Sequence, residues 1–93
     1  MEQKFITAWS AARENAAAQG VRMRPVADAD ALKFARRVLS GTRLSDGFNE
    51  LKAKGHLKWS LEALVIDKRF TELFTDEEAN EALMRLLEAG YRF

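Results

Sequence analysis

The sequence predicts an all-α fold: a compact bundle of about five short helices in a single domain, residues 1–93. Apolar residues recur at spacings of three and four along most of the chain, and no segment alternates as a strand would. Polar caps and glycines divide these apolar stripes into lengths that suit short helices. An apolar share of 47% with 31% charged residues is typical of a globular domain.

The first helix is expected over residues 3–19. Its apolar stripe has spacings of four, three and four and consists of Phe5, Trp9, Ala12 and Ala16. Gly20 should end this helix, with Val21 folding back on the last turn. The connector that follows, residues 21–27, contains the only proline, Pro25, and is where we expect a hinge.

The second helix should start near Asp28 or Asp30, because either carboxylate can cap it. It should end at about Ser40, before Gly41. Its inward face is expected to hold the apolar residues Ala31, Leu32, Phe34, Ala35, Val38 and Leu39. Its outward face is expected to hold Lys33, Arg36, Arg37 and Ser40.

A third, shorter helix should follow Ser45 and end at Gly55. The ring of His56 is then expected to lie over Leu51. The buried residues of this segment are expected to be Leu44, Phe48 and Leu51.

The fourth helix should begin at Ser60, which can cap it. Trp59 precedes the cap and Leu64 stands at the fourth helical position, a spacing typical of a hydrophobic staple. The buried face is expected to be Leu61, Leu64 and Val65. Asp67 should interrupt the helix, because the apolar pattern restarts after it in a short segment with the character of a 3₁₀ turn.

The fifth helix has the clearest boundaries. Thr75 is followed three residues later by Glu78, which is the capping-box pattern, and the apolar residues Ala79, Leu83 and Leu86 come next. Gly90 should end the helix, with Tyr91 folding back on Leu86. Glu81 stands four residues before Arg85, which is the favourable order for a pair on a helix surface.

Charge is unevenly placed along the chain, although the net charge is only +1. Residues 20–60 carry nine Lys and Arg against four acids, a balance of +5. Residues 61–93 carry four Lys and Arg against eight acids, a balance of −4. This polarity indicates association with another macromolecule.

The basic segment, residues 32–58, has the order helix, short turn, helix and glycine-terminated exit, and this order resembles a helix-turn-helix. Its second half resembles the recognition helix of winged-helix regulators through Leu44, Phe48, Leu51 and Gly55. The resemblance covers under a third of the chain. It implies four DNA-facing residues, Arg43, Asn49, Lys52 and Lys54. Asn49 would then pair with an adenine edge and the basic side chains would reach phosphates.

Protein association is the first hypothesis, and DNA binding is the alternative. Asp46 and Glu50 share the exposed face of the third helix, where they would repel phosphates. Ser60 starts another helix at the point where a wing would need strands. A group of acids, Asp76, Glu77, Glu78 and Glu81, lies at a helix start, where carboxylates complement the helix dipole. The same acidic face could receive a basic partner.

Aromatic residues supply the other candidate contact surface. Trp59, Tyr91 and Phe93 stand outside the core-like spacings, and together on one side they would form a patch of the kind enriched at protein interfaces. The candidate partner-binding residues are therefore Lys33, Arg36, Arg37, Arg43, Asn49, Lys52, Lys54, Trp59, Tyr91 and Phe93.

Several functional classes lack their sequence signatures. The chain has no cysteine, and its one histidine, His56, has no adjacent nucleophile and orienting acid. It also lacks a phosphate-binding glycine loop and a metal-ligand motif. We therefore expect no catalysis, no cofactor and no metal, while an enzyme site assembled from dispersed Asp, Glu and Arg residues stays open.

The sequence also predicts the cellular location of the protein. The N-terminus has no apolar signal region, and the longest apolar run, residues 63–66, is far too short to span a bilayer. We expect a small soluble cytoplasmic protein with no membrane partner. A protein partner or self-association is favoured, and nucleic acid is the alternative.

Overall fold

The computed structural model describes residues 2–23, 26–41 and 44–91, and all of the regular structure in these ranges is helical. The α-helices are α1 (Glu2–Ala18), α2 (Ala31–Ser40), α3 (Phe48–Lys54), α4 (Leu61–Val65) and α5 (Asp76–Glu88). Three 3₁₀ turns lie between them: η1 (Asp28–Asp30), η2 (Leu57–Trp59) and η3 (Lys68–Leu73). The all-α fold predicted from the sequence is confirmed.

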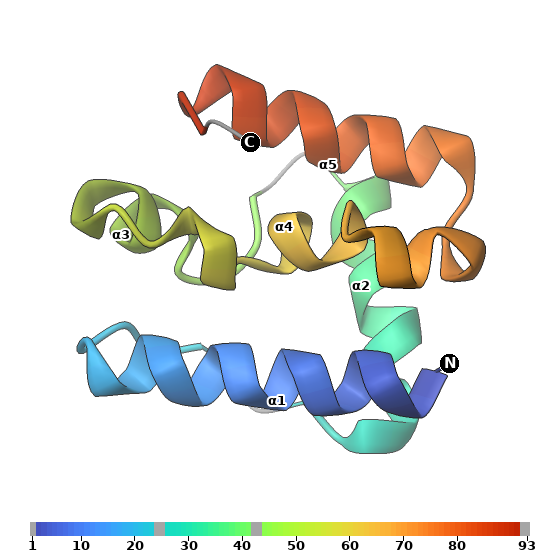
Figure 1. Cartoon of the computed structure of the whole chain (residues 1–93), viewed down its shortest axis with the longest axis horizontal. Coiled ribbons are helices and arrows are strands. Elements are labelled where there is room, and N and C mark those ends of the chain that lie inside the picture. The colour runs from blue at the N-terminus through green and yellow to red at the C-terminus, as the bar shows by residue number, and fades with distance from the viewer. Residues whose placement is uncertain (1, 24–25, 42–43, 92–93) are drawn as a thin grey trace.

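The helices form three layers (Figure 1). α1 and α5 lie on opposite outer sides, and the chain from α3 through α4 to η3 runs between them. α2 crosses behind this middle layer and contacts both α1 and α5. α4 is therefore central, since it packs against α1 on one side and α5 on the other. Among the described residues, no helix is long and apolar enough to cross a membrane.

The core has two parts. The larger lies among α1, α2, α4 and η3, where Phe5 makes edge-to-face contacts with Phe70 and Phe74 at centroid distances of 5.4 and 5.5 Å. Such geometry adds stabilisation beyond the apolar area that the rings bury. The smaller part joins the end of α1 to α3 and α5 and consists of Ala16, Val21, Phe48, Leu51, Leu57 and Leu86.

The predicted helix ends are largely confirmed, because each is made by contacts within a few residues. After α1, the N–H of Val21 donates to the carbonyl of Ala16 at 2.9 Å, past Gly20 with φ 83°. After α5, the N–H of Tyr91 donates to the carbonyl of Leu86 at 2.9 Å. Ser60 caps α4 by accepting from the N–H of Ala63 at 3.2 Å. These are the fold-back ends and cap that local sequence predicts.

Asp67 ends the α4 segment as predicted and caps η3. Its Oδ1 accepts from the N–H of Arg69 at 2.9 Å, and its Oδ2 lies 3.0 Å from Nη2 of the same arginine. The side-chain hydrogen bond from Arg69 lowers the pKa of the Asp67 carboxyl. This pair is at the surface and fixes a turn.

Two predictions about α2 and α3 are wrong. Neither Asp28 nor Asp30 caps α2 with its side chain, because the 3₁₀ turn η1 leads directly into the helix. α3 follows Ser45 as predicted, with Gly47 at the cap (φ 76°), while the hydroxyl and N–H of Ser45 both donate to Glu62. Leu44 is 39% exposed and lies outside the core. The hinge predicted at 21–27 remains a prediction, since residues 24–25 lie outside the described ranges.

Loss of the α5 cap should destabilise the fold measurably. Thr75 Oγ1 accepts from the N–H of Glu78 at 3.1 Å, and Glu78 Oε1 accepts from the N–H of Thr75 at 2.8 Å. Thr75→Ala removes the first of these bonds and should lower the free energy of unfolding by about 1 kcal/mol in urea titrations. Thr7→Ala, on the exposed surface of α1, is the control and should be close to neutral. Equal effects of the two changes would contradict this helix start.

Candidate functional site

The basic residues predicted on α2 lie on its exposed face. Lys33, Arg36 and Arg37 are all solvent-exposed. Arg36 is also engaged within the molecule: its Nη2 donates to the carbonyl of Leu73 at 2.8 Å, and its Nε lies 3.8 Å from Glu78 Oε2. Some of the opposite charges of the basic and acidic segments therefore pair with each other within the monomer.

The basic residues predicted on α3 lie on a separate part of the molecule. Asn49, Lys52 and Lys54 are exposed, and Arg43 lies outside the described residues. α3 has its main contacts with η2, whereas α2 packs against α1 and α5, and Figure 1 shows the two helices well apart. The described parts of the basic segment therefore do not form the packed helix pair of a helix-turn-helix.

The predicted aromatic residues are partly used in packing. Trp59 is half-buried and stacks on His56 with ring centroids 4.4 Å apart, and Lys58 Nζ lies 5.5 Å from its ring centroid. Tyr91 is half-buried against the same smaller core cluster as Trp59. Phe93 lies outside the described residues. Trp59 and Tyr91, the two described residues of the predicted patch, are thus both half-buried.

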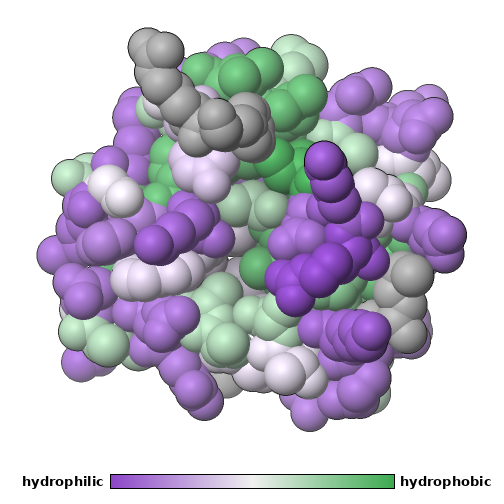
Figure 2. Space-filling view, in the orientation of Figure 1, coloured by the Kyte–Doolittle hydropathy of each residue, from purple (hydrophilic) through white to green (hydrophobic). Residues whose placement is uncertain are grey.

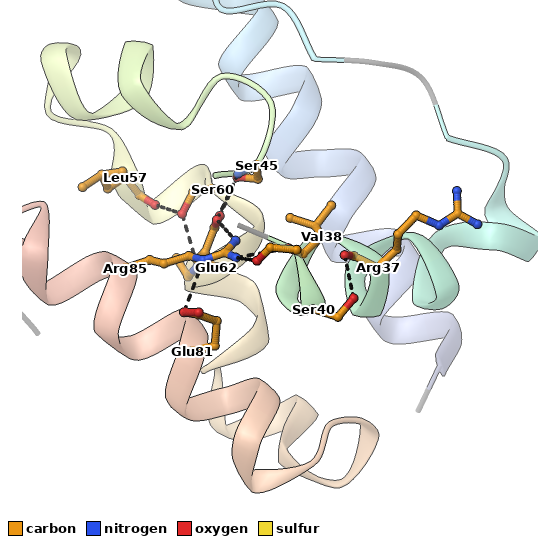
Figure 3. A network of polar contacts seen from close by, with 11 residues as sticks. Arg37, Val38, Ser40, Ser45, Leu57, Ser60, Glu62, Glu81 and Arg85 are labelled. Carbon is orange, nitrogen blue, oxygen red and sulfur yellow. Dashed lines mark hydrogen bonds and ion pairs between the residues drawn. The ribbon is translucent and has the colours of Figure 1, made fainter. Parts of the chain in front are cut away.

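A buried ion pair that was not predicted from the sequence lies at the centre of the molecule (Figure 3). Glu62 of α4 is 0% exposed and Arg85 of α5 is 7% exposed, and Arg85 Nη1 donates to Glu62 Oε2 at 3.2 Å. The N–H of Ser45 donates to Oε2 at 3.1 Å, and the Ser45 hydroxyl donates to Oε1. Three donors from two other parts of the chain therefore surround this carboxylate.

The rest of the Arg85 guanidinium joins further parts of the fold. Its Nη2 donates to the carbonyls of Val38 and Gly41 at 3.1 and 3.0 Å, at the end of α2. Its Nε lies 3.6 Å from Glu81 Oε2, so the predicted pair on α5 is present. The network links α2, α4, α5 and the segment before α3, and it leaves the Glu62 carboxylate with no access for a substrate.

A spacing signal could have revealed this pair. Arg85 stands three residues after Ala82 and next to Leu86, on the buried side of α5. Glu62 stands three residues before Val65, on the buried side of α4. A charged residue at a core position of each of two neighbouring helices indicates a buried pair, because a lone buried charge would be too costly.

The opposite side of α5 is apolar but exposed. Met84 and Leu87 are 56% and 55% exposed, and Leu83 is half-buried beside them. Their spacings of three and four place them, together with Asn80, on one side of the helix. We call this surface the α5 outer face; it consists of Asn80, Leu83, Met84 and Leu87. Figure 2 shows apolar atoms along the upper edge of the view, where Figure 1 places α5. Single exposed apolar residues are ordinary, but a row on one helix indicates a contact surface.

A hollow of about 330 Å³ adjoins the α5 outer face. It lies between α5 and the segment from α4 to η3 and is lined by Val65, Ile66, Thr71, Ala79, Asn80 and Leu83. Leu83 and Asn80 belong to both the hollow and the α5 outer face, so the two form one continuous surface. Most of the lining is apolar, which suits the side chains of a partner.

The exposed charges that α5 itself carries beside this surface are all negative. The acids of α5 are Asp76, Glu77, Glu78, Glu81 and Glu88. Arg85 is the only basic residue of α5, and it is turned into the core by Glu62. Glu77 and Glu88 are exposed and fall with Glu81 on the helix edge beside Met84. We call these three residues the acidic edge.

The described residues contain no group of three or more His, Asp or Glu side chains arranged to hold a metal ion. Comparison with known proteins identifies no relative: no family model, no curated protein and no solved structure matches the chain.

Proposed function

We propose that this chain is a small non-catalytic binding protein that acts through protein–protein association, with the α5 outer face as its contact surface. The observation that supports the proposal is the exposure of Met84 and Leu87, 56% and 55%, on a helix whose opposite side is already buried. These two large apolar side chains stand one turn apart in water. Covering them with a partner is favourable, because it removes apolar surface from water. Methionine also adapts to partner side chains of different shapes.

The alternative is a small helix-turn-helix-like DNA-binding protein that uses the basic 32–58 segment. The exposure of Lys52 and Lys54 on α3 supports it. The separation of α2 from α3 and the engagement of Arg36 with Leu73 and Glu78 count against it. Protein association through α5 therefore ranks first.

Removing the two exposed apolar side chains should abolish partner binding without unfolding the protein. Met84→Ser with Leu87→Ser should eliminate the specific partner in quantitative pull-downs from native extract. The melting temperature should change little, because both side chains already face solvent. Lys52→Glu with Lys54→Glu, on α3, is the control and should retain that partner.

Two outcomes would contradict the proposal. Recovery of the same proteins by the α5 variant and the wild type would mean that the α5 outer face is not the contact surface. Micromolar, salt-sensitive binding of duplex DNA by the wild type, lost in the α3 variant, would favour the DNA-binding alternative, because phosphate contacts depend steeply on salt.

A further inference from the structure

We infer that the α5 outer face and its hollow take a basic amphipathic helix from the partner, an inference that rests on the function proposed above. The surface has the form of a groove: α5 is one wall, and the segment from α4 to η3 is the other. Leu83 lies within the groove, and Met84 and Leu87 extend its apolar surface along α5. The acidic edge borders this apolar strip on the side away from the hollow.

The shape of the groove favours a helix as its occupant. α5 has 13 residues and is about 20 Å long, so a partner helix of similar length can lie along it. A helix presents apolar anchors at spacings of three and four, which match the row formed by residues 80, 83, 84 and 87. An extended peptide that binds by strand addition would need an exposed strand edge, and the described residues contain no strand.

The charge on the α5 wall of the groove favours a basic occupant, although the wall formed by η3 carries the exposed Lys68 and an Arg69 paired with Asp67. Glu77 and Glu88 are exposed on the acidic edge, and Glu81 beside them is half-buried and paired with Arg85. Arg85, the only cation of α5, is held inside by Glu62. Lysine or arginine beside the apolar anchors of a partner helix would meet these carboxylates. An acidic partner helix would be repelled, so the acidic edge gives specificity as well as faster association.

The same charges disfavour two other occupants. A second copy packed α5 against α5 would bring acidic edges together, with both Arg85 side chains unavailable. A lipid surface would also be disfavoured, because membrane-binding amphipathic helices carry basic residues that meet anionic headgroups. A basic helix of another protein is therefore the occupant that fits both the apolar strip and its charged border.

Three synthetic peptides of about 18 residues, long enough to form a helix, test this inference. The first carries leucines at helical spacing with lysines beside them, the second has glutamates in place of the lysines, and the third scrambles the leucines of the first. Fluorescence anisotropy should show the lysine peptide binding the full chain at least about tenfold more tightly than either other peptide. Its affinity should fall as salt is raised.

Variants of the protein separate the contributions of apolar and of charged side chains to the affinity for the lysine peptide. Met84→Ser with Leu87→Ser should weaken the lysine peptide by about tenfold or more, as expected for central apolar anchors. Glu77→Gln with Glu88→Gln should weaken it several-fold and reduce its salt dependence. Glu14→Gln with Glu50→Gln makes the same change of charge on α1 and α3, and Leu44→Ser removes an exposed leucine elsewhere; neither should alter the affinity.

Several results would overturn the inference. Equal binding of the lysine and glutamate peptides, or no binding of either, would exclude a basic helix as the occupant. A wild-type dimer in sedimentation that dissociates on Leu87→Ser would assign the surface to a second copy instead. The proposed function would stand in the first case if Met84→Ser with Leu87→Ser still eliminates the native partner, so the two failures are distinguishable.

Discussion

Arg85→Met is expected to lower the free energy of unfolding by about 3–5 kcal/mol, the largest effect of any substitution considered for this protein. The change leaves the Glu62 carboxylate, 0% exposed, without its counter-ion. It also removes the Nη2 group that donates hydrogen bonds to the carbonyls of Val38 and Gly41. Uncompensated charge in the core is costly, whereas the net contribution of an intact buried pair is small, because desolvation offsets most of the attraction. Urea unfolding of the purified variants measures the effect.

A double-mutant cycle distinguishes the pair from simple loss of packing. Glu62→Leu combined with Arg85→Met should be less destabilising than Arg85→Met alone, because neither charge then remains buried. Glu81→Gln, which removes the partly exposed partner of Arg85, is the control and should cost only about 0–1 kcal/mol. A cost below about 1 kcal/mol for Arg85→Met would mean that the carboxylate of Glu62 is not enclosed as described.

Gly47→Ala is expected to destabilise the protein by about 2–4 kcal/mol, from backbone strain and overpacking together. Gly47 has φ 76°, in the left-handed region, and an added Cβ would lie 2.8 Å from Val21 Cγ1. Val21 is fully buried, so it has little room to move. Thermal and urea unfolding should both register the loss.

Gly55→Ala provides the matched comparison. Gly55 has a similar φ of 75°, but an added Cβ there would have nothing within 4 Å. Its substitution should therefore cost only the conformational strain, about 1 kcal/mol. Equal losses at the two glycines would argue against close packing of the segment before α3 on Val21.

The helices and most of their ends could be predicted because they depend on residues near one another in the chain. The capping box of Thr75 and Glu78, the cap at Ser60 and the glycine-terminated ends of α1, α3 and α5 all involve contacts over six residues or fewer. The hydrogen bonds of Ser45, by contrast, depend on a residue far away in the chain. Ser45 has the residue type of a cap, but a carboxylate 17 positions away accepts both of its hydrogen bonds.

The candidate site was harder to predict than the fold, because it depends on which side of each helix is covered. Lys33, Lys52 and the other predicted basic residues that the structure describes are exposed, yet the sequence did not reveal that α2 and α3 lie on separate parts of the molecule. α5 has apolar residues on two sides, and their spacing does not say which side faces the core. Packing against α4 buries the side with Ala82 and Leu86 and leaves Met84 and Leu87 exposed.

The sequence by itself determined the helical class and the start and end of most helices, because capping and apolar periodicity act over one or two turns. Only the tertiary structure decided the partners of Glu62 and Arg85, which are 23 residues apart. Their pairing requires α4 and α5 to pack side by side, and it removes the only cation of α5 from the surface. The acidic character of the α5 surface thus follows from a long-range contact that the pattern of α5 alone does not specify.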